Sequence, residues 1–112
     1  MSYRVAVASN DGKYVNQHFG RATQFLIFDV EDDKYEFSEL RKNEPPCSGE
    51  GHNEDQMSRT VELLADCREV LVSQIGLGAI QALSSKGIRS SVLPDFIDDA
   101  LKSLIQSQRN VY

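Results

Sequence analysis

The order of the apolar segments constrains the fold of this 112-residue chain more than any other feature. Apolar residues at every second position indicate strands, and apolar residues at every third or fourth position indicate helices. The sequence predicts, in chain order, strands at 3–9, 23–30 and 34–38, a helix from 53, a strand at 70–72, a helix from 79, a strand at 88–93 and a helix from 95. Three strands therefore come first, and helices and strands alternate after them.

This order favours a single α/β domain over residues 1–112, built on one mixed sheet. The first three strands can pair in antiparallel succession, and the last two can be added through right-handed helical crossovers. This is the order of the ribonuclease H-like architecture, for which we expect a five-stranded sheet of order 3-2-1-4-5 with helices on both faces. In the central first strand, Val5 and Val7 point to one face, and Ala6 and Ala8 point to the other. The third strand is expected at a half-exposed edge.

Polar residues predict where two of the helices begin. Asn53 with Gln56 resembles a capping box, which would start a helix at that point. Asp95 is expected to be the N-cap of the last helix, with two further aspartates in its positive first turn. We expect residues 106–112 to form a frayed tail.

The charge of the chain excludes two classes of partner. The formal net charge is −5, and six acidic residues fall between positions 29 and 39. Nucleic acids and anionic membranes require a basic footprint, so neither is an expected partner. The sequence shows no signal peptide and no apolar run of membrane-spanning length. It contains two cysteines, which are too few for a disulfide framework. These features predict a cytoplasmic protein with free thiols.

The stretch from Asn10 to Arg21, which joins the first two predicted strands, is the first candidate functional segment. It is too long for a tight hairpin, and loops of this size inside compact domains are usually functional or disordered. Tyr14, Val15 and Phe19 are apolar anchors that argue for order. His18, near the far end, is one of only two histidines in the chain.

Three side chains on predicted loops can donate to soft or borderline metals, namely His18, Cys47 and His52. The loop after the first strand, the loop after the third and the turn after the fourth all leave the same end of the predicted sheet. We therefore expect the donors to meet there. From spacing alone, a structural role in the loop remains the alternative for each of them. Cys67, just before a buried strand, is expected to be a core residue.

Two further patterns bear on anion binding and catalysis. Gly76-Leu77-Gly78 before a helix can present N–H groups to an anion, or it can make a tight turn, since the third glycine of a dinucleotide motif is missing. A ribonuclease H-like nuclease needs a carboxylate on its first strand, and residues 3–9 contain none. Nuclease activity is therefore not expected, and a zinc or iron hydrolase lacks a convincing base–nucleophile set.

Several motifs together resemble the dinitrogenase iron–molybdenum cofactor-binding family, the group that includes NifX, NafY and the C-terminal domain of NifB. The matching segments are Val5–Ser9, Gln17–Ala22, Pro45–Cys47 with His52, Asp66–Val72, Ile75–Ala79, Leu83 and Gly87–Ile88. The resemblance spans nearly the whole chain. Its most specific parts are the His-Phe-Gly element and the Ile-Gly turn, taken together.

The resemblance implies a ribonuclease H-like domain that is not an enzyme. Such a domain binds, carries or protects an iron–sulfur or iron–molybdenum–sulfur cluster during nitrogenase cofactor biosynthesis, and its partners are that cluster and cofactor-assembly or nitrogenase proteins. The family's cofactor-binding histidine falls on His18, and Cys47 and His52 match a donor-bearing loop. The alternative is a small regulatory or scaffolding domain that uses an inert fold for protein contacts.

The expected site combines metal ligands with groups that complement an anionic cluster. The expected cofactor contacts are His18, Cys47, His52, Arg21, Gly76 and Gly78, of which His18, Cys47 and His52 are also the expected metal ligands. Positive potential is expected from the helix that follows Gly76 and from Lys13, Arg21, Arg41 and Lys42.

Overall fold

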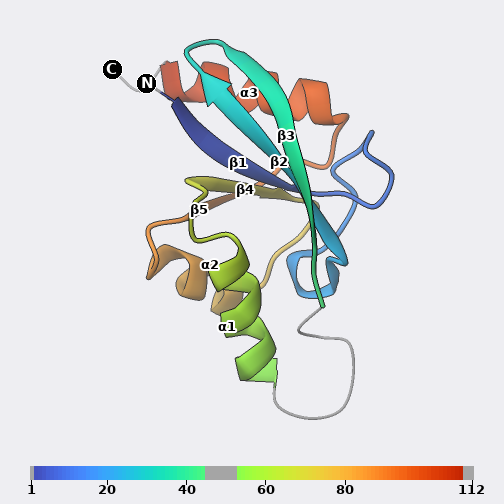
Figure 1. Ribbon diagram of the computed structural model, residues 1–112, viewed down its shortest axis with the longest axis vertical. Helices are drawn as coiled ribbons and strands as arrows, with labels where there is room; N and C mark the ends of the chain where they lie inside the picture. Colours follow the sequence, from blue (N-terminus) through green and yellow to red (C-terminus); the bar gives the residue numbers. More distant parts are fainter. Residues whose placement is uncertain (1, 45–52, 110–112) are drawn as a thin grey trace.

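The chain forms a five-stranded mixed sheet with helices on both faces (Figure 1). The computed structural model describes residues 2–44 and 53–109. Its elements are β1 (Ser2–Ala8), a 3-10 turn η1 (Phe19–Arg21), β2 (Gln24–Glu31), β3 (Lys34–Lys42), α1 (Asn53–Leu63), β4 (Glu69–Val72), α2 (Leu77–Ser84), β5 (Arg89–Val92) and α3 (Ile97–Arg109). The strand order β3-β2-β1-β4-β5 confirms the predicted topology. In this part of the chain, no helix has both the length and the apolar character needed to cross a membrane.

Alternation along the central strand β1 divides the apolar core between the two faces of the sheet. Ala6 and Ala8 belong to a buried cluster with residues of α1 and α2, and Val5 and Val7 belong to a second cluster with the apolar stripe of α3. The small alanine side chains let α1 and α2 pack close to the sheet. β1 pairs antiparallel with β2 and parallel with β4, so the loop after β1 and the turn after β4 leave the same end of the sheet.

β3 is longer than predicted, and a bulge is the physical reason. Phe28 of β2 pairs with Phe37, whereas the preceding Ile27 pairs with Glu39. Ser38 is therefore an extra residue in β3, and it reverses the alternation of the residues that follow. The sequence predicted a strand over residues 34–38 and a long loop from Arg41 to Asn53, and the bulge interrupts the alternation on which the strand prediction rested. The structure instead continues the strand to its last residue at position 42.

α3 departs from its predicted bounds at both ends. It begins at Ile97 and not directly after Asp95, and it continues to Arg109 where a frayed tail was expected from position 106. At its start, Val15 N donates to the Asp95 carbonyl at 2.9 Å, and Ile97 N donates to the Lys13 carbonyl at 2.8 Å. This pairing, which includes an isolated bridge between Tyr14 and Phe96, keeps the chain out of the helix until Ile97. The two aspartates of the first turn, Asp98 and Asp99, lie where the sequence placed them.

Candidate functional site

His18 is exposed, and the residues on either side of it are anchored. Phe19 is fully buried, with its ring 6.0 Å from that of Phe25. The Gln17 amide exchanges two hydrogen bonds of 3.3 Å with Thr23, since Nε2 donates to Oγ1 and Oε1 accepts from the backbone N. The backbone of His18 is thereby fixed while its imidazole faces solvent, an arrangement suited to binding a ligand from outside.

The backbone around His18 also pairs with the turn that follows β4. His18 forms an isolated parallel bridge with Gln74. Phe19 N donates to the Gln74 carbonyl at 2.9 Å, and Ser73 N donates to the Gln17 carbonyl at 3.0 Å. Because α2 starts shortly after Gln74, η1 and the beginning of α2 come together at one end of the sheet, as the topology predicted.

Asn43, at the end of β3, ties the start of the second long loop to the same region. Its Nδ2 donates to the Ala22 carbonyl at 2.9 Å, its Oδ1 accepts from Thr60 Oγ1 at 3.1 Å, and its backbone N donates to the Thr23 carbonyl at 2.9 Å. Ala22 is the C-cap of η1, so the loop leaves the sheet beside the turn that carries His18. The sequence reasoning missed Asn43, because an asparagine before a proline pair indicates only a loop.

Cys47 and His52, the other two predicted donors, lie outside the described residues. The two sides of their loop are joined where Gln56 Nε2 donates to Glu44 Oε2 at 3.0 Å. Gln56 therefore reaches across the loop, whereas the sequence had assigned it to a capping box. In the parts of the chain described, 2–44 and 53–109, no group of three His, Cys, Asp or Glu side chains is arranged to hold a metal ion.

Gly76 and Gly78 leave open space at the start of α2. Gly76 is the N-cap with a φ of −87°, a value open to any residue. A Cβ added at either position would meet no atom within 4 Å. Neither crowding nor backbone strain therefore demands glycine at either position. What the two glycines do provide is unhindered access to the N–H groups at the start of this helix.

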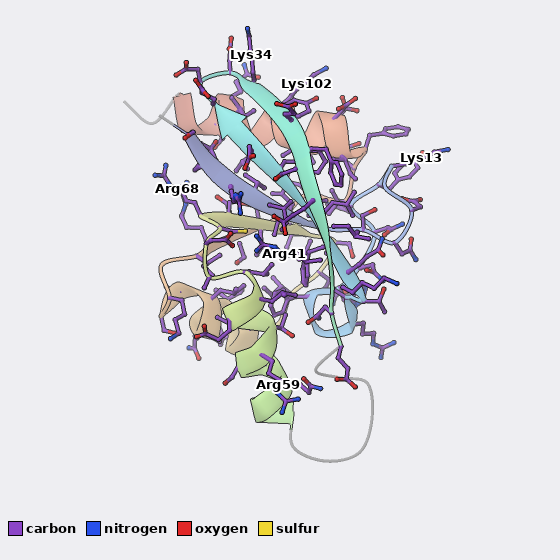
Figure 2. The ribbon with its side chains drawn as sticks, in the orientation of Figure 1. Lys13, Lys34, Arg41, Arg59, Arg68 and Lys102 are labelled. Carbon is purple, nitrogen blue, oxygen red and sulfur yellow. The ribbon has the colours of Figure 1, made fainter. Side chains whose placement is uncertain are left out.

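Arg21 lies next to His18. Arg41 was also expected to supply positive potential to the site, but its side chain is engaged elsewhere. Arg21, exposed in the last turn of η1, donates its backbone N to the His18 carbonyl at 3.0 Å. Arg41 Nη1 and Nη2 instead donate to the two carboxylate oxygens of Asp66 at 2.6 and 2.8 Å, and Nη1 also donates to the Leu63 carbonyl. Its side chain is 14% exposed and lies between β3 and the end of α1 (Figure 2). In the same view, Lys13 points outward from its loop.

The pair of Asp66 and Arg41 predicts a pH-dependent contribution to stability. The Arg41 guanidinium holds the pKa of Asp66 well below its usual range. A carboxylate whose pKa is lower in the folded state stabilises the fold above its unfolded pKa and loses this contribution as the pH falls through the folded value. We expect Asp66→Asn to lower the free energy of unfolding by about 1–2 kcal/mol at neutral pH, a figure reduced for screening because the Asp66 side chain is 46% exposed.

Urea unfolding as a function of pH tests this expectation. The difference between wild type and Asp66→Asn should begin to shrink below roughly pH 4, where the unfolded carboxylate takes up a proton, and should continue to shrink as the pH falls further toward the lowered pKa of the folded state. Asp29→Asn is the control, because Asp29 contacts Arg4 at a more exposed position and should matter less. A constant difference from neutral to acid pH would show that the charge of Asp66 is not responsible.

Cys67 is a core residue, as the sequence predicted. It is buried, and its Sγ lies 3.6 Å from Asp66 Oδ1. Burial raises the pKa of the Cys67 thiol to about 12. Because the thiolate is the form that binds metals, Cys67 is a poor ligand at neutral pH.

Comparisons with known proteins agree with this fold and identify the family. A sequence model described as dinitrogenase iron-molybdenum cofactor matches residues 1–107. The FeMo cofactor biosynthesis protein NifB of Frankia alni is 37% identical over 103 residues, which cover 89% of this chain and 20% of that protein. Protein NifX of Azotobacter vinelandii is 32% identical over 92 residues, which cover 77% of this chain and 53% of NifX.

A solved structure supports the architecture independently. The apo form of the orange protein from Desulfovibrio gigas matches with a TM-score of 0.71 at 21% sequence identity, covering 95% of this chain and 89% of that one. At this identity the likeness concerns the fold alone. The chain spans a fifth of the length of the Frankia NifB and about half of NifX. Since the family match extends over nearly all of its residues, the chain belongs to the dinitrogenase iron-molybdenum cofactor family.

Proposed function

We propose that this domain binds an iron–sulfur or iron–molybdenum–sulfur cluster at the end of the sheet where His18 lies, and carries or protects it without catalysing a reaction. The observation that carries the proposal is the exposed imidazole of His18 on a backbone fixed at Gln17, Phe19 and Gln74. Family membership supports it, because relatives such as NifB are named for FeMo cofactor biosynthesis.

The residues around His18 suit an anionic cluster chemically. A neutral imidazole can donate a lone pair to iron or molybdenum, and a protonated one cannot. Arg21 and the N–H groups at Gly76 and Gly78 supply local positive potential in a chain whose net charge is −5.

Cys47 and His52 complete the proposed ligand set, since the loop that holds them starts beside η1 at Asn43. A set of a few mixed ligands fits a carrier, which must release its cargo, better than a closed four-cysteine site does.

Cluster binding by the wild-type chain is the direct test of this proposal. The purified protein is mixed under anaerobic conditions with isolated iron–molybdenum cofactor and, separately, with a reconstituted [4Fe–4S] cluster, and is then passed through gel filtration. We expect iron and sulfide, with molybdenum in the first case, to elute with the protein. Elution of all metal in the small-molecule volume from both mixtures would contradict cluster carriage and favour a scaffolding role.

A further inference from the structure

An exposed apolar groove runs along the α3 face of β2 and β3. Phe37 and Leu40 of β3 are 53% and 46% exposed, although both are large apolar side chains. The groove is lined by the apolar residues Leu26, Phe28, Phe37, Phe96 and Ile97, and also by Gly12, Lys13 and Asp98. Leu40 lies on the same face, in register with Leu26. Single exposed apolar residues are ordinary on protein surfaces, but a contiguous groove of them marks a place where another chain can bind.

The opposite face of the same two strands is acidic. Its carboxylates are Asp29 and Glu31 of β2 and Glu36 and Glu39 of β3. Arg4 lies 3.1 Å from Asp29 and 3.8 Å from Glu39, and Arg41 lies 3.1 Å from Glu39. Both guanidinium groups also bind Asp66, so Arg4 and Arg41 together contact the carboxylates of Asp29, Glu39 and Asp66. Lys34 is in register with Glu31 on the same face. Three cations therefore stand against five carboxylates, which leaves an excess of negative charge. The surface therefore complements basic side chains.

β3 is the outermost strand of the sheet, and its free edge lies between these two faces. All of its residues are exposed or half-buried. Successive side chains of a strand point to opposite faces of a sheet, so an extended segment along this edge reaches the apolar groove and the acidic face at once. A helix laid into the groove would contact only one of them.

We propose that the β3 edge docks an extended segment of a partner protein in which apolar and basic residues alternate. The backbone of the segment pairs with β3, as in other cases of strand addition to a sheet edge. Its apolar side chains cover Phe37 and Leu40, and its lysines or arginines face Glu36 and Glu39. A second copy of this chain is disfavoured, because it would bring two acidic faces side by side.

The bulge at Ser38 adds selectivity to this edge. A bulge increases the local twist of a strand and discourages indiscriminate pairing with other sheets. A partner segment must therefore follow that twist, which a free peptide can do and a rigid edge strand cannot. The proposal does not depend on the cargo at His18, since His18 lies in the loop after β1 and not on β3.

The test uses a synthetic peptide of the length of β3 in which valine and lysine alternate, with blocked ends and a fluorescent label. A peptide with glutamate in place of lysine is the control probe. We expect the valine–lysine peptide to bind in an anisotropy titration, with an affinity that falls as salt is added. Amide NMR shifts in the labelled protein should change mainly along β3.

Two variants and two matched controls locate the binding surface. Phe37→Thr and Glu36→Lys should each weaken binding about tenfold. Leu77→Thr replaces an exposed apolar residue of α2, and Glu62→Lys reverses an exposed charge on α1, so neither should change the affinity. If Phe37→Thr fails to fold, as judged by circular dichroism, Leu40→Thr provides the same test.

Several results would overturn the proposal. These are the absence of binding, equal binding of the glutamate peptide, and equal loss of affinity in the control variants. A dimer in gel filtration that Phe37→Thr dissociates would assign the surface to a second copy and would also reject a basic partner.

Discussion

Replacing Phe19 with alanine is expected to lower the free energy of unfolding by about 3–5 kcal/mol. Phe19 is fully buried in the cluster that also holds Ala8, Ala22 and Phe25, so its removal leaves a cavity that its neighbours can fill only in part. The whole fold is stable by only about 5–15 kcal/mol, and the melting temperature should therefore fall on the order of 10–20 °C. Because Phe19 N also pairs with Gln74, the same change should loosen the backbone at His18.

Calorimetric unfolding of Phe19→Ala beside Phe37→Ala tests this expectation. The two substitutions are chemically identical, but the Phe37 side chain is half exposed at the sheet edge. Phe37→Ala should change the free energy of unfolding by less than about 1 kcal/mol. Equal effects of the two substitutions would show that Phe19 does not anchor the turn in solution.

Most of the fold follows from local patterns in the sequence. Alternation along residues 3–9 predicted which residues of β1 face each helical layer, because the faces of a strand differ regularly. The switch from three successive strands to alternating helices and strands predicted the sheet order, because successive strands tend to pair antiparallel and helical crossovers add parallel strands. Local patterns fail where a single extra residue breaks the period. Ser38 is such a residue, and for this reason the sequence pattern did not predict the part of β3 that follows it.

The site was predictable only in outline, since long-range contacts decide which side chains are available. Arg41 was expected to supply positive potential, but Asp66, distant in sequence, binds its guanidinium. Asn43 carries no motif, and its role depends on the positions of Ala22 and Thr60. Likewise, the start of α3 depends on pairing with the loop after β1 and not on its own capping residue.

Replacing His18 with alanine is expected to weaken cluster binding by about a hundredfold or more, since loss of a metal ligand exceeds the effect of losing its outer-shell partners. The free energy of unfolding should change by less than about 0.5 kcal/mol, because the side chain is exposed. Arg21→Ala removes charge and not a ligand, so its effect should be smaller and should disappear at high salt. Cys47→Ala and His52→Ala should each give a further loss of affinity if those residues complete the ligand set.

The most direct measurement of the central claim is an anaerobic titration of wild type and His18→Ala with isolated iron–molybdenum cofactor, followed by absorbance, with and without added imidazole. Free imidazole can occupy the space left by the missing side chain and restore the lost ligand. The account predicts weak binding by His18→Ala, partial recovery of affinity with imidazole and an unfolding transition like that of wild type. If folded His18→Ala binds the cofactor as tightly as wild type does, His18 is a structural loop residue, and the cluster site lies elsewhere.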